Sequence, residues 1–186
     1  MLKGVSSFFV SILFCSFVTS AWSADRKENT YEDEQIKVRV FIRTPEQIAA
    51  FYQGREFPKN AVDELRKACN FTVLMRNIGS EIIWLELDRW RFSAKGKVIE
   101  PLGRDYWQQR WKTLKLTTAH QSTFGWTLLP DSRDLHTDEP VGGGVTLPML
   151  NEPFDVVMPL RTGADKQGKI KNIEFKNIHC KQESTE

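Results

Sequence analysis

Two segments near opposite ends of the chain alternate apolar and polar side chains. Residues 36–42 (IKVRVFI) and 154–160 (FDVVMPL) both place apolar residues at every second position. Successive side chains of a β-strand point to opposite faces, so this period indicates strands with one buried face. A glycine-flanked turn at residues 162–168 leads to a last predicted strand at residues 169–180. The chain is therefore predicted to be mainly β.

Two further strands are expected at residues 69–76 and 81–92, separated by a turn at 77–80. The second has apolar residues at odd and even positions, which predicts cover on both faces. In the segment NFTVLMRNIGSEIIWLEL, a strand ends in Asn-x-Gly and another strand follows. This segment resembles the second and third strands of many bacterial immunoglobulin-like β-sandwich domains. The resemblance implies an immunoglobulin-like antiparallel β-sandwich of about seven strands.

Helical patterns interrupt the strands, chiefly near the start of the chain. The sequence TPEQ at residues 44–47 combines an N-cap, a proline at the first helical position and a capping box. In residues 104–115, Trp107, Trp111 and Leu114 follow the i, i+4, i+7 spacing of an amphipathic helix. Helices are predicted near residues 45–53, 60–68 and 104–115.

The remaining segments complete a single domain over residues 36–182. A strand is expected at residues 122–129, and a polar, mobile loop with four acidic residues and three consecutive glycines at 130–144. A loop of this length is uncommon and often functional. Residues 24–35 are highly charged and lack apolar periodicity, which predicts a flexible N-terminus of the mature protein.

Residues 1–23 have the pattern of a secretory signal peptide. Lys3 precedes an apolar stretch at residues 8–18, and Ala21 and Ser23 supply the small residues of a cleavage site. The apolar stretch is shorter than the about 20 residues that a membrane-spanning helix needs. We therefore expect an exported, periplasmic protein without a membrane span after cleavage; an uncleaved anchor is the alternative.

Two cysteines, Cys69 and Cys180, remain after cleavage of the signal. An even pair in an oxidising compartment favours one disulfide, although two separate thiols are the alternative. In an immunoglobulin-like sandwich Cys69 would begin an early strand and Cys180 would end the last one. The bridge would then join distant parts of the sandwich.

The composition and motifs argue against several functions. The counts of 26 Lys+Arg and 24 Asp+Glu give a net charge of +2, which does not suggest nucleic acid as the partner. The sequence contains none of the G-x-S-x-G, H-E-x-x-H, P-loop or G-x-G-x-x-G motifs. Neither an enzyme nor a cofactor is expected.

Metal binding is one alternative function. His136 lies in the acidic loop with Asp134 and Asp138, and His120 could approach it across the sheet. Imidazole and carboxylate ligands together suit zinc or copper. The loop has no EF-hand spacing, and a solvated acidic loop is the simpler interpretation.

Tryptophans supply the other candidate site. Trp107 and Trp111 lie on a helix expected at the periphery, where they could bind a partner or a sugar. Trp84 and Trp126 are expected in the core. The candidate contact residues are Trp107, Trp111, Arg110 and Trp90. The alternative is that these rings fill the core between helix and sheet.

We thus expect an exported, non-catalytic binding or accessory protein whose partner is another envelope protein. The tryptophan helix and the loop at residues 130–145 would form the contact region. The alternatives are a periplasmic metal-handling protein and a binder of glycan or peptidoglycan.

Overall fold

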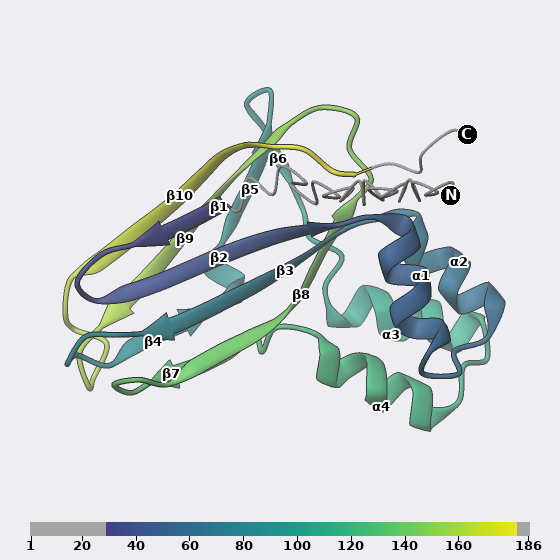
Figure 1. Cartoon of the computed structure of the whole chain (residues 1–186), viewed down its shortest axis with the longest axis horizontal. Helices are drawn as coiled ribbons and strands as arrows, with labels where there is room; N and C mark the ends of the chain where they lie inside the picture. Colours follow the sequence, from purple (N-terminus) through teal and green to yellow (C-terminus); the bar gives the residue numbers. More distant parts are fainter. Residues whose placement is uncertain (1–28, 182–186) are drawn as a thin grey trace, which may run out of the picture.

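The computed structural model describes residues 29–181, so the expected signal peptide at 1–23 lies outside the described residues. Two antiparallel sheets face each other (Figure 1). The first sheet has the strand order β1 (Asn29–Glu32), β2 (Ile36–Arg43), β3 (Ala68–Asn77) and β8 (Pro140–Pro148).

The second sheet is built around β9 (Phe154–Thr162). β10 (Ile170–Ile178) pairs along one edge of β9, while β4 (Ile83–Glu86) and β5 (Arg91–Ala94) share the other edge. β7 (Ser132–Leu135) extends the sheet beside β4, and β6 (Lys97–Ile99) extends it beside β5.

The prediction of a mainly β, antiparallel sandwich is confirmed. The order β2-β3-β8 against β10-β9-β4-β7 matches strands A-B-E against G-F-C-C′ of immunoglobulin-like sandwiches. The alternating residues of β2 and β9 bury Val38, Val40, Val156 and Met158 between the sheets. The period-two pattern thus identified the core faces of both strands.

The single strand expected at residues 81–92 is corrected to two strands separated by the 3₁₀ turn η1 (Leu87–Arg89). Ile83 and Leu85 are buried before the turn, and Trp90 and Phe92 are buried after it. The three-residue turn changes which positions face inward. Apolar residues at odd positions before the turn and at even positions after it therefore enter the same core, whereas Trp84 is half-buried on the opposite face of β4.

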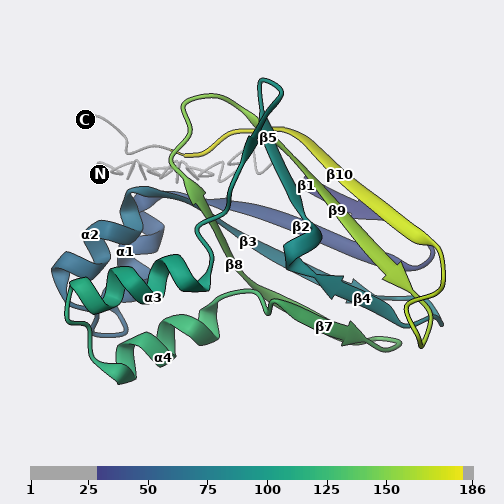
Figure 2. The ribbon, with the colours of Figure 1, turned by 180° about the vertical axis from the view of Figure 1, so that it is seen from behind.

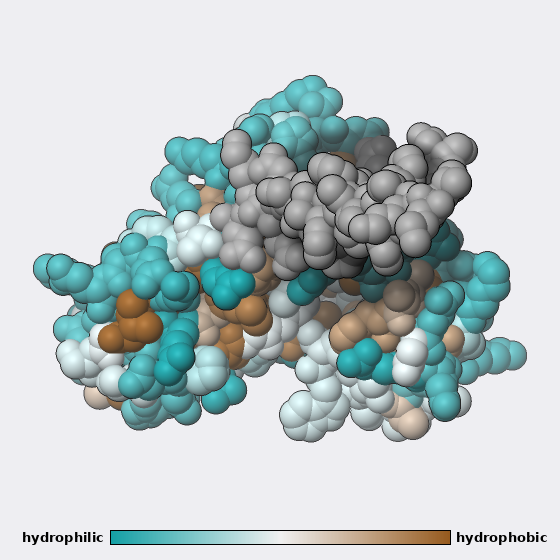
Figure 3. Space-filling view, in the orientation of Figure 1, coloured by the Kyte–Doolittle hydropathy of each residue, from teal (hydrophilic) through white to brown (hydrophobic). Residues whose placement is uncertain are grey.

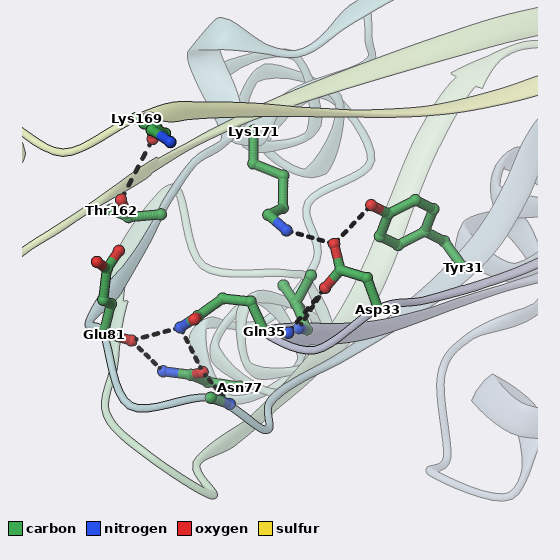
Figure 4. A network of polar contacts seen from close by, with 10 residues as sticks. Tyr31, Asp33, Gln35, Asn77, Glu81, Thr162, Lys169 and Lys171 are labelled. Atoms are coloured by element: carbon green, nitrogen blue, oxygen red, sulfur yellow. Dashed lines mark hydrogen bonds and ion pairs between the residues drawn. The ribbon is translucent and has the colours of Figure 1, made fainter.

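The prediction of a flexible segment at residues 24–35 is wrong for residues 29–35. β1 pairs with β2 in the register Asn29↔Val40, and the charged side chains belong to an ordered edge. The Tyr31 hydroxyl and the Lys171 ammonium both donate to the Asp33 carboxylate (Figure 4). Asp33 also accepts from the backbone N–H of Gln35. These contacts join the β1–β2 turn to β10.

The Asn-x-Gly turn after β3 has a structural role. The Asn77 side chain is buried and donates to the carbonyls of Glu81 and Leu135, 2.7 and 2.8 Å away. Its Oδ1 accepts from the N–H of Gly79 at 3.1 Å and from Gln35 at 3.3 Å (Figure 4). The turn therefore connects the two sheets at this end of the sandwich.

Four helices form a second layer at the other end of the sandwich (Figures 1 and 2). They have their own apolar cluster, to which Tyr52, Leu65, Trp107 and Phe124 belong. Between β2 and β3 lie α1 (Pro45–Gln53) and α2 (Lys59–Arg66), and between β6 and β7 lie α3 (Arg104–Thr113) and α4 (Thr118–Thr127). All three predicted helices are confirmed.

The strand expected at residues 122–129 is wrong, because most of this segment belongs to helix α4. The Thr117 hydroxyl accepts from the His120 N–H and caps the helix. Phe124 turns into the helical cluster, whereas Trp126 points away from it. Only Leu128 forms a β-bridge, to Gly144. A short apolar stretch at alternate positions does not distinguish a helix from a strand.

The mobile loop expected at residues 130–144 is also corrected, because most of it belongs to strands β7 and β8, which lie in different sheets. The glycines lie within β8, where space is short. A Cβ at Gly143 would lie 2.3 Å from the backbone nitrogen of Leu129. The chain leaving α4 crosses β8 at this position, which requires a glycine.

The predicted disulfide is present between Cys69, in β3, and Cys180, just after β10. It links the two sheets beside the helical layer. Within residues 29–181, every helix is too short or too polar to span a membrane.

Candidate functional site

The tryptophans predicted to contact a partner are buried. Trp107 and Trp111 are 2% and 1% exposed and stack on each other within the helical cluster. Trp90 lies in the sandwich core at 5% exposure. Arg110 is half-buried and forms an ion pair with Glu64 at 2.7 Å. The structure thus buries the three tryptophans, two in the helical cluster and one in the sandwich core, and holds Arg110 in an ion pair.

Trp126 has the opposite arrangement to the one expected. Its side chain is 89% exposed, although the sequence predicted a core position. Trp84, also expected in the core, is half-buried; its Nε1 donates to the Gly163 carbonyl, and the Lys166 ammonium lies 4.5 Å from its ring centroid. Trp126 is therefore the candidate contact residue among the tryptophans of residues 29–181.

Trp126 stands at a pocket of about 780 Å³ between α1, α4 and the outer face of β3 and β8. Figure 3 shows the molecule hollowed on this face, between the sheet and the helices. Ligand sites in proteins commonly have volumes of about 300–1,000 Å³ and mostly apolar walls. The apolar walls here include Ile48, Phe51 and Leu128.

The polar groups of this pocket are mostly engaged. The Tyr52 and Thr127 hydroxyls lie 2.8 Å apart, and burial raises the pKa of Tyr52 to about 12. The Thr146 hydroxyl accepts from Trp107 Nε1 at 2.8 Å. Arg43 donates through Nε to the Thr72 hydroxyl at 3.1 Å, and none of the described residues contacts its two terminal nitrogens by a hydrogen bond or ion pair. Among the described residues that line this pocket, Arg43 is the charged one, and its terminal nitrogens are available to a ligand.

A second pocket of about 570 Å³ adjoins the first, and both are lined by Trp126, Leu128 and Gly142. Arg104 and Arg133 line this second pocket. Arg104 binds Asp131 at 2.9 Å and two backbone carbonyls, whereas Arg133 is exposed and 3.7 Å from Glu139. We call the two pockets together the Trp126 groove.

The residues predicted to bind a metal are not brought together. His136 Nε2 lies 3.4 Å from Asp134, but Asp138 binds Arg76. His120 is on α4, where its ring packs on Phe57. Within residues 29–181, nowhere do three His, Cys, Asp or Glu side chains gather as metal ligands would.

One strongly charged cluster lies on the outer face of the second sheet. Arg161 binds Glu86 through two nitrogens at 2.6 and 2.8 Å, and Lys166 and Arg89 approach within 3.1 Å. The hydrogen bond from Arg161 is the main reason why the pKa of Glu86 falls to about 2. The cations already have a carboxylate partner, so the cluster supports the sheet.

Sequence reasoning missed the Trp126 groove because it assigned a strand to α4. With a helix at residues 118–127, Phe124 and Trp126 lie on different faces, and one of them must point outward. Arg43 ends β2 on the face opposite to the core residues, and its outward position follows from the strand period.

Comparison with known proteins adds little. No family model and no curated protein matches the chain. A Bacillus subtilis crystal structure described as "a putative lipoprotein (ycdA)" aligns with a TM-score of 0.44 and 11% identity, over 82% of this chain and 39% of that one. The yjhA protein from Bacillus subtilis aligns with a TM-score of 0.39 and 11% identity, over 70% and 76% of the two chains. These similarities carry no functional assignment.

Proposed function

We propose that this chain is an exported, non-catalytic binding or accessory protein of the cell envelope, and that it binds another envelope protein through the Trp126 groove. The exposed fraction of Trp126, 89%, carries the proposal. Tryptophan is enriched at the centres of protein interfaces because its burial there is strongly favourable. A concave apolar pocket directly beside the ring adds area that a partner can bury.

Export is supported by the sequence pattern at residues 1–23 and by the Cys69–Cys180 disulfide. Disulfides persist in oxidising compartments and are rare in the cytosol. The periplasm is the envelope compartment that fits both features. The non-catalytic role is supported by the engaged hydroxyl groups of the groove: Tyr52 and Thr127 bond each other, and Thr146 bonds Trp107 and the Leu102 carbonyl. Among the described residues, those that line the two pockets include no histidine.

Site-specific photocross-linking tests this function. Trp126→p-benzoylphenylalanine is expected to give a discrete cross-linked protein adduct in cells that make the protein natively. The matched control carries the same group at Val98, which is 74% exposed and far from the groove along the chain. Adducts of the same size from both positions, or none from position 126, would contradict the proposal.

A glycan partner is the second candidate, because flat exposed indole rings also stack on sugars. Soluble peptidoglycan fragments should then quench tryptophan fluorescence in the wild type and leave Trp126→Ala unchanged. A flat titration of the wild type across the millimolar range argues against this candidate.

A further inference from the structure

The free edge of β8 has one unpaired position beside Trp126. On the edge that faces away from β3, the carbonyls of Gly144 and Thr146 accept from the backbone N–H groups of Leu129 and Leu102. In an antiparallel strand, every second residue directs its N–H and C=O to the same edge. Gly142 therefore directs both groups to this edge, and none of the strands within residues 29–181 pairs with it there.

Gly142 also lies at the junction of the groove. It lines both pockets together with Trp126 and Leu128. An extended segment that paired with Gly142 would continue the line of Leu128, which already pairs with β8 at Gly144. Such a segment would lie against the exposed indole ring and reach both pockets.

The charge of the groove selects the chemistry of that segment. The ionisable side chains that line its two pockets include Arg43, Arg104 and Arg133 but neither Asp nor Glu. Arg104 is already bound to Asp131, whereas the terminal nitrogens of Arg43 have no hydrogen bond or ion pair within the described residues. Carboxylates bind guanidinium groups through strong, short hydrogen bonds.

We propose that the Trp126 groove binds an extended acidic polypeptide segment of the partner protein. The segment adds a short strand to β8 at Gly142, lies against Trp126 and places a carboxylate at Arg43. This is recognition by strand addition, in which backbone hydrogen bonds hold the peptide and pockets select its side chains. The inference rests on the proposed function and names the partner chemistry for the same groove.

Fluorescence anisotropy with labelled peptides tests the charge requirement. The probe is acetyl-Glu-Val-Glu-Leu-Glu-Val-amide, which alternates acidic and apolar residues. It is expected to bind at least about tenfold more tightly than its counterpart with lysine at the acidic positions. Arg43→Gln should weaken the acidic peptide about tenfold, whereas Lys97→Gln, an equal loss of charge on an exposed strand outside the groove, should not. Equal binding of the two peptides would overturn the proposal.

A pair of variants at one position tests strand addition. Gly142→Pro removes the outward N–H without removing a bond to β3, and Gly142→Ala keeps it. Both add a Cβ that meets the movable end of Leu74. The acidic peptide should bind Gly142→Pro about fivefold more weakly than Gly142→Ala. Circular dichroism confirms that both variants fold, and equal affinities would rule out the backbone pairing.

Trigalacturonate, an acidic sugar, separates the peptide from an acidic glycan. Tighter binding of trigalacturonate than of the peptide would overturn the proposal. A cross-linked protein at position 126 without binding of the acidic peptide would retain the proposed function and reject the acidic strand. If neither the cross-linked adduct at position 126 nor binding of the acidic peptide is found, the groove is rejected as the contact site.

Discussion

The indole rings of Trp107 and Trp111 stack with 4.9 Å between their centroids and 23° between their planes. Phe124 of the neighbouring helix α4 contacts both rings, and Trp107 Nε1 donates to the Thr146 hydroxyl in β8. This pair therefore joins the helical layer to the sandwich. The pair thus stabilises the fold at a position where the sequence predicted a partner-binding surface.

Trp107→Ala should lower the free energy of unfolding by about 3–5 kcal/mol, because it leaves a cavity in the helical cluster. Trp126→Ala should change it by no more than about 0.5 kcal/mol, because the ring is exposed. Urea denaturation followed by circular dichroism measures both values. Similar losses of stability in the two variants would contradict the exposed position of Trp126.

Reduction of the Cys69–Cys180 disulfide should lower the free energy of unfolding by about 2–5 kcal/mol. The bridge closes a loop of 111 positions and so restricts the unfolded chain. The measurement compares urea denaturation with and without dithiothreitol. The double variant Cys69→Ala, Cys180→Ala is the control and should be insensitive to the reductant.

Gly143→Ala should be destabilising by about 1–3 kcal/mol, because its Cβ would meet the Leu129 backbone, which cannot move as a side chain can. Gly125→Ala, within helix α4, brings its Cβ no closer than 3.7 Å to the Arg104 side chain and should not destabilise the fold, because alanine favours a helix more than glycine does. Thermal unfolding compares the two. Equal melting temperatures would contradict the close approach of the chain between α4 and β7 to β8 at Gly143.

Glu86 should make the free energy of unfolding depend on pH in the acidic range. Its pKa falls from 4.5 to about 2 in the folded protein, so the folded state favours the ionised carboxylate. The resulting stabilisation is fully present above the unfolded pKa and is lost as the pH falls from 4.5 toward 2. Glu86→Gln should therefore lose less stability over this interval than the wild type. Urea denaturation of both proteins at pH 5 and at pH 2.5 measures the difference. Equal losses of stability in the wild type and in Glu86→Gln would contradict the lowered pKa of Glu86.

Much of the fold could be predicted because its strongest signals are local. The capping box at Thr44 and the alternation in β2 and β9 depend only on neighbouring residues, and all three are confirmed. The break at η1 could not be predicted in this way. It depends on the hydrogen bond from the Leu87 N–H to the Asp131 carbonyl, between residues far apart in sequence.

The candidate site was harder to predict, because exposure depends on which helix face packs. Trp107 and Trp126 have the same side chain, and only the tertiary arrangement of α3 and α4 buries one and exposes the other. For Arg43, the strand period gives only an outward position at the end of β2. Its role in the groove requires α1 and α4 to lie over the sheet, which the periodicity of β2 does not encode.

The position of the disulfide also determines how the protein would respond to mechanical tension between its two ends. A pull on the C-terminal end passes at Cys180 directly to Cys69, so it bypasses the 111-position loop that holds most of the sandwich and helices α3 and α4. Within residues 29–181, the part that can be drawn out is the chain before Cys69, with β1, β2, α1 and α2. The Trp126 ring and β8 are thus contained in the inextensible part, whereas Arg43 and α1, which line the same groove, lie in the extensible part. Tension would therefore open the groove and release a partner bound there.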